Sequence, residues 1–279
     1  MKLWKRFISN LYFSGMRSIV GRDRCGLVNL YHCCLPKTGS QWIGKILSDP
    51  TVFAYCGLKS HNYQSKLAGR YDPRNIIDRT FTEPFPTGSI VTPLYISFDN
   101  FLAIPKPEHY KAFFVMRDPR DILISWYFSM KHSHTALGNV VKLREILDGM
   151  SFHEGISYAM EHLNDRGYFQ ALASWIDAPR RDPNTLVVRF EDLIGPASEE
   201  VFGILFKHCD IRMPRKQQCG LLEKYSLKAL SGRRPGQEDM RHHYRKGISG
   251  DWRNHLNDSL ATRFKELAGD LLSRLGYCE

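Results

Sequence analysis

Short apolar segments alternate with helical patterns along most of the chain, and this alternation constrains the fold more than any other feature. Residues with the length and content of buried strands lie at 27–35, 90–95, 112–116 and 185–189. Helical spacing follows at 41–47, 121–130, 138–178, 196–209 and 257–275. Strands that alternate with helices favour a parallel sheet covered on both faces. The sequence therefore predicts a single α/β domain over residues 25–279, with a central parallel sheet flanked by helices.

The segments between these elements refine that prediction. Residues 57–89 are rich in Gly, Pro, Asn and Asp, which predicts mostly loop with short helices. Within the helical stretch 138–178 we expect four apolar or aromatic side chains to reach the core: Phe152, Ile156, Tyr158 and Trp175.

The N-terminal segment has a separate character. Residues 1–22 contain five basic residues and no acidic one, and their apolar residues fall at helical spacing. We therefore expect residues 1–24 to form a basic amphipathic helix docked on the main domain, and they lack the pattern of a signal peptide. Weak contact of residues 1–22 with a membrane surface is one alternative, and a transit peptide is another.

Charge and cysteine content narrow the function classes. The chain has 39 Lys and Arg against 29 Asp and Glu, a net charge of +10 that favours an anionic partner. Its apolar runs are far shorter than the roughly 18 residues of a membrane span. Seven irregularly spaced Cys, without CxxC or HxxxH spacing, match neither a disulfide framework nor a zinc site. We expect reduced thiols, a cytoplasmic location and no metal.

A polar loop joins the first predicted strand to the first helix. Backbone N–H groups at such a strand–loop–helix junction bind anions, and Gly39 permits close approach of the backbone. Thr38, Ser40 and Gln41 add side-chain donors, and Lys37 adds a positive charge. The order of residues differs from that of the nucleoside-triphosphate loop GxxxxGK[ST]. An ordinary strand–helix turn remains open as the alternative for this loop taken alone.

Two further segments place basic residues where they can meet the same ligand. Arg117 ends the strand at 112–116, and Ser125 follows it by about two helical turns. In open α/β sheets, ligands bind outside the carboxyl ends of strands. The string YRKGISGDW contains Arg245, Lys246 and Gly247, which we interpret as a flexible cationic clamp. Taken alone, the first pattern also fits a surface Arg paired with an Asp, and the second fits a solvated basic loop.

Together, the strings PKTGSQW, RDPRDILISWYF and RKGISGDW resemble the sulfotransferase family that uses 3′-phosphoadenosine 5′-phosphosulfate (PAPS). VVRFEDL at 187–193 is similar to another string of that family, which usually has Tyr where Phe190 stands. The resemblance runs from about Leu30 to Leu275. It implies a P-loop-kinase-like sulfotransferase fold, PAPS as cofactor with 3′-phosphoadenosine 5′-phosphate (PAP) as product, and metal-free catalysis.

The resemblance also implies roles for individual residues. Lys37, Thr38, Gly39, Ser40 and Gln41 would hold the 5′-phosphosulfate, and Lys37 would stabilise the leaving group. The remaining cofactor contacts would come from residues that bind the adenine or the 3′-phosphate: Trp42, Ser226, Arg117, Ser125, Arg245, Lys246 and Gly247. Leu227 stands where the family usually has an aromatic residue beside the adenine.

The general base is where the sequence departs from the family. Cytosolic members carry Lys-Thr-His, whereas this chain has Val91, Thr92 and Pro93 in the corresponding stretch. His61 is our first candidate for the base, because a histidine has a suitable pKa. A substrate-contacting or loop histidine is the alternative reading of His61. Three other residues are weaker candidates: Glu83, Tyr95 and Asp99. His132 and His134 follow the helix of Arg117 and are candidates for lining the acceptor site.

The sequence therefore predicts a PAPS-dependent sulfotransferase that sulfates a hydroxyl or nitrogen of a small molecule, with a natural product among the candidate acceptors. Transfer to a glycan or protein is an alternative, and a degenerate nucleotide-binding relative without activity is another. No string interleaves aromatic and basic residues as nucleic-acid modules do, so we expect no nucleic-acid partner. The sequence leaves the oligomeric state open.

Overall fold

The computed structural model describes residues 25–67, 72–136 and 139–277. Five strands form one sheet in the order β2-β3-β1-β4-β5, and every neighbouring pair is parallel. The strands are β1 (Asn29–Cys34), β2 (Lys59–His61), β3 (Ser89–Tyr95), β4 (Tyr110–Met116) and β5 (Thr185–Arg189). The predicted single α/β domain with a central parallel sheet is confirmed.

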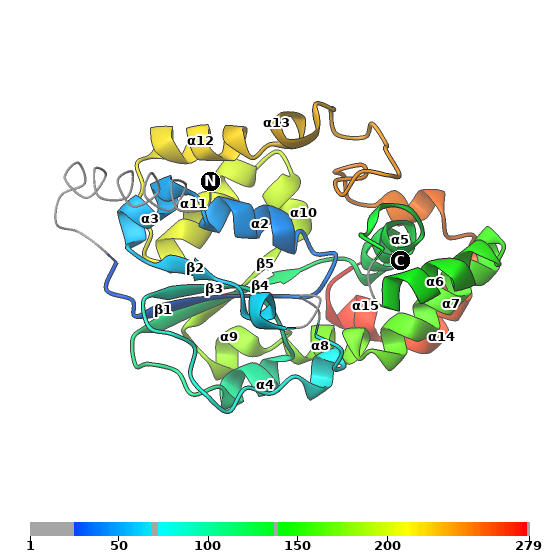
Figure 1. The fold of residues 1–279 in the computed structure, drawn as a ribbon, viewed down its shortest axis with the longest axis horizontal. Helices are drawn as coiled ribbons and strands as arrows, with labels where there is room; N and C mark the ends of the chain where they lie inside the picture. Colours follow the sequence, from blue (N-terminus) through cyan, green and yellow to red (C-terminus); the bar gives the residue numbers. More distant parts are fainter. Residues whose placement is uncertain (1–24, 68–71, 137–138, 278–279) are drawn as a thin grey trace.

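Helices cover both faces of the sheet (Figure 1). On one face lie α2 (Ser40–Leu47), α3 (Pro50–Cys56), α10 (Phe190–Ile194), α11 (Ser198–His208) and α12 (Arg215–Lys224). On the other face lie α4 (Phe98–Ala103), α8 (Tyr168–Ser174) and α9 (Ala178–Arg181).

The remaining elements gather mainly beyond the carboxyl ends of the strands, on the right of Figure 1. The helices there are α5 (Pro119–Phe128), its π-helical extension η4 (Ser129–Ser133), α6 (Asn139–Asp148), α7 (Phe152–Asp165), α14 (Asp258–Ala268) and α15 (Leu271–Arg274). The other short elements are α13 (Leu227–Ser231) and the 3-10 turns η1 (Tyr63–Lys66), η3 (Ile76–Asp78) and η5 (Asp251–Asn254). None of the helices described here is long and apolar enough to cross a membrane.

Strand register places the predicted site at one edge of the sheet. Cys34, the last residue of β1, pairs with Tyr95 of β3 and with Val115 of β4. The residues after these three strands therefore emerge side by side, so the loop after β1 lies beside Arg117. This arrangement is the one that open α/β sheets use to bind ligands.

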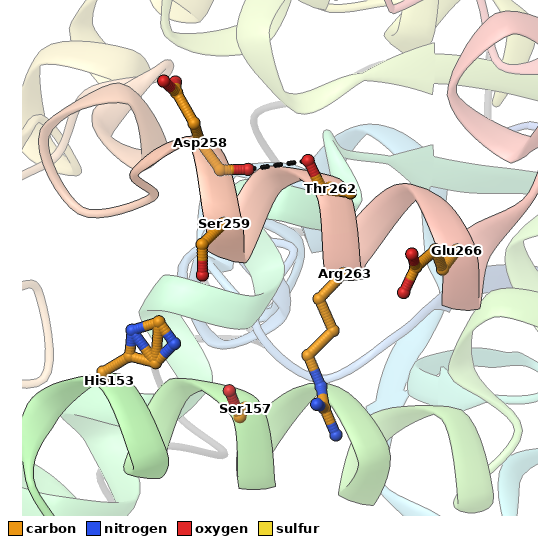
Figure 2. A pocket seen from close by; sticks show the side chains of 7 residues that line it. All are labelled: His153, Ser157, Asp258, Ser259, Thr262, Arg263 and Glu266. Carbon is orange, nitrogen blue, oxygen red and sulfur yellow. Dashed lines mark hydrogen bonds between the residues drawn. The ribbon is translucent and has the colours of Figure 1, made fainter.

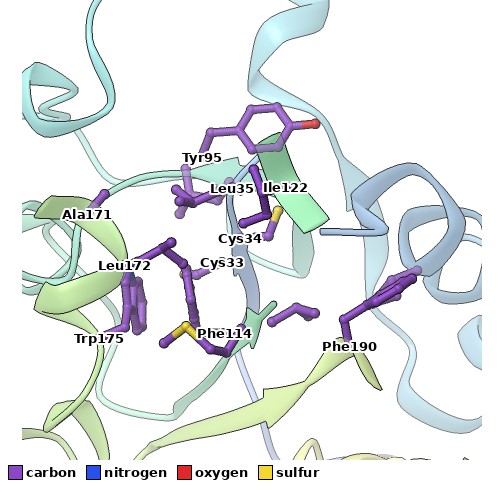
Figure 3. Close-up of a cluster of buried hydrophobic side chains, with 14 of the residues drawn as sticks. Cys33, Cys34, Leu35, Tyr95, Phe114, Ile122, Ala171, Leu172, Trp175 and Phe190 are labelled. Carbon is purple, nitrogen blue, oxygen red and sulfur yellow. The ribbon is translucent and has the colours of Figure 1, made fainter. Parts of the chain in front are cut away.

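The core that fixes this edge is dense and aromatic. Every residue of β1 is buried, as expected for a central parallel strand. Trp175 is fully buried and stacks on Phe114 with ring centroids 4.4 Å apart (Figure 3). His32 is also fully buried, and one of its ring nitrogens shares a hydrogen bond of 2.8 Å with the Thr92 hydroxyl. Burial lowers the pKa of His32 to about 3, so this histidine is a neutral core residue.

The structure differs from the sequence predictions in four places. Residues 59–61 form an edge strand that we expected to be loop. The helix predicted at 121–130 continues as a π-helical turn to Ser133, and the last helix breaks at Gly269. Phe152 is 39% exposed, so its predicted place in the core was wrong, whereas Ile156 and Trp175 are fully buried. The helix predicted at 1–24 lies outside the described residues.

Candidate active site

The loop between β1 and α2 presents its backbone toward the open edge of the sheet. Lys37 and Gly39 both have left-handed backbone conformations, with φ of 74° and 81°. The Thr38 hydroxyl donates to the carbonyl oxygen of Leu35 at 2.8 Å and holds the turn closed. The Thr38 N–H donates to the carbonyl oxygen of Leu35 at 3.4 Å, and the Ile43 N–H donates to that of Gly39 at 3.0 Å. The N–H groups of the first turn of α2 lie at the start of the helix, where no preceding helical carbonyl accepts from them, so they can bind an anion.

Arg117 packs directly against this loop. Its Nη1 donates to the carbonyl oxygen of Lys37 at 2.6 Å, and its guanidinium lies 4.4 Å from the ring centroid of Phe190. The residue is 9% exposed, and its buried Nε has no hydrogen-bond partner among the described residues. A buried charged donor without an acceptor is costly, so an anionic ligand at this position would stabilise the site.

Lys37 is influenced by two other positively charged side chains, those of Arg117 and Arg245. Burial, together with the positive charges of Arg117 and Arg245, lowers the pKa of Lys37 to about 7. Neighbouring like charges disfavour the protonated ammonium. An anion placed among these three groups would relieve their repulsion and restore the charge of Lys37.

Phe190 explains why residue 39 is a glycine. A Cβ atom built on Gly39 would lie 2.8 Å from Cε2 of Phe190, in addition to the strain of the positive φ. The same ring stacks under Arg117, and it meets the indole of Trp42 edge-on at 6.4 Å. One aromatic residue from the FEDL string thus positions three of the predicted site residues.

We expect Gly39→Ala to lower the free energy of unfolding by about 1–3 kcal/mol, because both the backbone strain and the contact with Phe190 oppose the new methyl group. Urea denaturation measures the change. Gly88→Ala is the matched control, since Gly88 has a φ of 73° but nothing within 4 Å of its added Cβ. Gly39→Ala must lose more stability than Gly88→Ala. Equal losses would show that Phe190 imposes no steric limit on the loop.

The predicted clamp is held by acidic residues. Arg245 pairs with Glu238 and Asp251, and Nζ of Lys246 lies 2.5 Å from Asp251 Oδ1. Asp251 is buried and also accepts from Asn254 at 2.9 Å. Burial would raise the pKa of Asp251, but hydrogen bonds from His255, Lys246, Asn254 and Arg245 outweigh it and keep the pKa well below its usual range. The clamp is therefore pre-organised, because its cations have fixed partners.

Gly247, at the end of the clamp, lies next to the residues predicted to flank the adenine. A Cβ on Gly247 would clash with Cδ2 of Leu227, so the two residues are in close contact. Ser226 precedes Leu227 and caps α13, where its hydroxyl oxygen accepts from the Ala229 N–H at 3.2 Å. The Trp42 indole N–H donates to the carbonyl oxygen of Tyr225 at 2.8 Å. Trp42, Ser226 and Gly247 therefore approach one another through α13 and the two residues before it.

The hydroxyl and amide donors of the loop have different environments. Ser40 is buried, and its hydroxyl shares a hydrogen bond of 2.9 Å with the Tyr95 hydroxyl. The exposed Gln41 donates to the same hydroxyl at 3.5 Å. Ser125 lies half-buried on α5, two turns beyond Arg117. The Thr38 hydroxyl already donates within the turn, so its proton is not available to an anion at the loop.

The structure does not bring His61 to the loop. His61 ends the edge strand β2, pairs with Val91, and packs against the ring of Phe85 at 5.9 Å. Tyr95 at the strand end lies four positions after Val91, which corresponds to roughly 13 Å along the sheet. The position of His61 therefore argues against its predicted role as the base.

The weaker candidates for the base are also poorly placed or protonated. Glu83 is exposed on a loop, and Asp99 pairs with Arg181 at 2.8 Å. Tyr95 does reach the loop, but burial raises its pKa to about 12, so its hydroxyl stays protonated near neutral pH. We interpret Tyr95 as a residue that positions Ser40.

Four residues of the site were not assigned their roles from the sequence. Phe190 was noted only as a departure from Tyr, Tyr95 only as a weak base, and Asp251 not at all. Asp121 likewise ties α5 to the clamp segment by accepting from the N–H groups of Gly250 at 2.7 Å and Trp252 at 3.0 Å. Both acidic residues lie inside the matching strings, RDPRD and SGDW, which is the signal that could have identified them.

A separate shallow groove of about 430 Å³ lies between α7 and α14 (Figure 2). It is lined by His153, Ser157, Asp258, Ser259, Thr262, Arg263 and Glu266. None of these residues belongs to the loop, the Arg117 helix or the clamp. Among the residues the structure describes, no group of His, Cys, Asp or Glu is arranged to hold a metal ion.

Comparison with known proteins identifies the class. The sulfotransferase domain family matches residues 32–276. The chain therefore belongs to this family, and it is a sulfotransferase by class. Cytosolic sulfotransferase 17 of Arabidopsis thaliana is 23% identical over 89% of this chain and 75% of its own length. Sulfotransferase 2A6 of Mus musculus is 26% identical over 57% of this chain and 55% of its own length.

Solved structures share the fold. A mouse sulfotransferase complexed with PAP superimposes with a TM-score of 0.54 and 14% identity, covering 94% of this chain and 88% of that chain. Retinol dehydratase, solved with androsterone and PAP, superimposes with a TM-score of 0.51 and 14% identity. The match covers 94% of this chain and 85% of that chain. At this identity the likeness concerns the fold, and it agrees with the sulfotransferase fold implied by the sequence.

Proposed function

We propose that this sulfotransferase transfers the sulfuryl group of PAPS to a hydroxyl or nitrogen of a small-molecule acceptor. The observation that carries the proposal is the buried Nε of Arg117, without an acceptor among the described residues, beside a Lys37 whose pKa burial and two cations lower to about 7. Such a site is incomplete without an anion. Family membership supplies the reaction class, and similar folds have been solved with PAP.

The residues fit a ligand with two anionic ends. The N-terminus of α2 and Lys37 would bind the 5′-phosphosulfate, and Gly39 would let the backbone approach it. Arg117 and Ser125 would bind the 3′-phosphate by charge-assisted hydrogen bonds. Arg245, Lys246 and Gly247 would close over it, and Trp42 and Ser226 would flank the adenine.

PAPS supplies an activated sulfuryl group whose leaving group is a phosphate. The chain supplies positive charge where that phosphate becomes more negative during transfer. Lys37 stands at the start of the α2 dipole, and its backbone carbonyl is fixed by Arg117 at 2.6 Å. Both groups are in place before reaction, which is what electrostatic preorganisation requires.

For the acceptor, two of the solved neighbours were obtained with small molecules, one with androsterone and one with retinol. We propose a small-molecule acceptor, a cytoplasmic location and no nucleic-acid partner. Transfer to a glycan or protein is the second candidate, because the usual Lys-Thr-His is absent from β3.

Incubation of the protein with ³⁵S-labelled PAPS and a cell extract tests this proposal. The extract is first separated into a small-molecule fraction and a macromolecular fraction. We expect label in the small-molecule fraction and formation of PAP. Label confined to macromolecules would favour the glycan or protein acceptor. PAP binding without transfer to either fraction would favour a degenerate, nucleotide-binding relative.

The free protein has a Lys37 pKa of about 7, and a bound anion should raise it. At a pH between these two pKa values, Lys37 is expected to take up a proton when PAP binds. Below pH 7 Lys37 is already protonated, so affinity is highest there. As pH rises above 7, affinity falls because the free lysine must first be protonated. Calorimetry in buffers of different ionisation enthalpy measures this uptake, which should disappear in Lys37→Met. Uptake that persists in Lys37→Met would assign the proton to another group.

A further inference from the structure

Arg233 makes several backbone contacts within the segment between α13 and η5, which passes above α5 in Figure 1. Its Nη1 donates to the carbonyl oxygens of Arg245 at 2.6 Å and Gln237 at 2.7 Å. Its Nη2 donates to the carbonyl oxygen of Tyr244 at 2.5 Å. One guanidinium therefore joins the chain before the clamp to the residues with which the clamp begins.

Backbone hydrogen bonds support the same arrangement. The Gly236 N–H donates to the carbonyl oxygen of Lys246 at 2.9 Å, and the Asp239 N–H donates to that of Arg245 at 2.9 Å. The Arg245 carbonyl oxygen thus accepts both from this N–H and from Nη1 of Arg233. The two clamp cations therefore stand on a backbone that Arg233 and the residues after it hold in place.

The charge of Arg233 is not cancelled by an acidic partner. Arg245 pairs with Glu238 and Asp251, and Lys246 pairs with Asp251. No ion pair among the described residues includes Arg233, and its guanidinium donates to carbonyl oxygens instead. Carbonyl dipoles satisfy these donors without removing the positive charge. Arg233 therefore adds to the positive potential around the clamp.

The clamp contacts both helices that begin at the predicted anion sites. On one side, the Arg245 guanidinium lies 4.5 Å from the ring centroid of Phe128, the last residue of α5. On the other side, Nζ of Lys45 on α2 lies 5.2 Å from the ring centroid of Tyr244. A shift of the backbone that Arg233 holds would change where the clamp cations stand between α2 and α5.

We propose that Arg233 is a positioning residue for the nucleotide, an inference that rests on the proposed function. It fixes the backbone from which Arg245 and Lys246 reach the 3′-phosphate, and its own charge attracts the same phosphate. Arginine suits this task because its planar fork presents five donors in a fixed geometry. A lysine would keep the charge but has one nitrogen where the guanidinium has two Nη atoms directed at different carbonyl oxygens.

The test measures binding of PAP and of adenosine 5′-phosphate, which lacks the 3′-phosphate, by calorimetry. We expect Arg233→Gln to weaken PAP binding by about 10- to 100-fold, the scale of hydrogen bonds to charged groups. Binding of adenosine 5′-phosphate should weaken by less than about threefold, because this nucleotide offers the clamp no 3′-phosphate. Arg233→Lys should show an intermediate loss for PAP.

Arg234→Gln is the matched control, because Arg234 is an exposed arginine next in the chain and its described hydrogen bonds use its backbone. It should bind both nucleotides as wild type does. An equal loss for the two nucleotides in Arg233→Gln would indicate a general structural role and overturn the proposal. Wild-type affinity for PAP in Arg233→Lys would leave a role for the charge alone and would overturn the positioning role.

Hydrogen exchange of the free protein, followed by nuclear magnetic resonance, adds a readout that needs no nucleotide. We expect the amides of Gly236 and Asp239 to exchange at least about tenfold faster in Arg233→Gln and Arg233→Lys than in Arg234→Gln. Unchanged exchange would overturn the proposal even if PAP affinity falls. If the amides exchange faster but wild type does not prefer PAP to adenosine 5′-phosphate, the cofactor assignment fails, whereas Arg233 is still shown to hold the clamp.

Discussion

Lys37→Ala is expected to lower turnover by about 10²-fold or more, the scale for removing one preorganised charge at a developing oxyanion. The positive charge of Lys37 is needed most when the bond to the leaving phosphate breaks. In the free protein, burial and two neighbouring cations already disfavour that charge. We therefore expect the affinity for PAP to fall much less than turnover does.

Steady-state and single-turnover kinetics distinguish these effects. Lys59→Ala is the control, since Lys59 is exposed on the edge strand β2. A raised KM with a normal kcat in Lys37→Ala would mean that Lys37 contributes equally to ground state and transition state. That result would contradict the assigned role.

Arg117→Ala is expected to weaken PAP binding by about 2–4 kcal/mol, or roughly 30- to 1,000-fold. The variant removes a buried donor that has no acceptor in the described part of the chain, together with the contact from Nη1 to the loop carbonyl. Unlike Lys37→Ala, this change should act mainly on affinity. Isothermal titration calorimetry gives the dissociation constants.

Arg117→Lys provides the matched comparison. It keeps the positive charge but loses the planar guanidinium that stacks on Phe190, so we expect an intermediate loss of affinity. Unchanged affinity in a folded Arg117→Ala protein, with circular dichroism like that of wild type, would remove Arg117 from the site.

The sequence was sufficient for four of the five described strands and for the loop after β1, because these depend on local patterns. The apolar run at 112–116 has the pattern of a buried strand, and the polar loop around Gly39 follows such a strand and precedes a helix. Both can therefore be located from the alternation and spacing of apolar residues. The edge strand at 59–61 was missed because it is three residues long, with Lys59 and Ser60 exposed, and so lacks an apolar signal.

The rest of the site depends on contacts between segments that are distant in the chain. The local residue pattern of a single sequence gives no signal for such contacts. Phe190 meets Gly39 across about 150 positions, and nothing in the local pattern links them. The choice of base shows the same limit. His61 was chosen because it is a histidine near the first helix, whereas sheet register places it far from the strand end.

The most direct test of the account compares the affinities of PAP and adenosine 5′-phosphate, which lacks the 3′-phosphate, in wild type and in Arg117→Ala. Calorimetry requires no identified acceptor. The account predicts that wild type binds PAP at least about 30-fold more tightly than adenosine 5′-phosphate, and that most of this preference disappears in Arg117→Ala. Equal affinity of the wild-type protein for the two nucleotides, or a preference that survives in Arg117→Ala, would contradict the assignment of this edge of the sheet as a PAPS site.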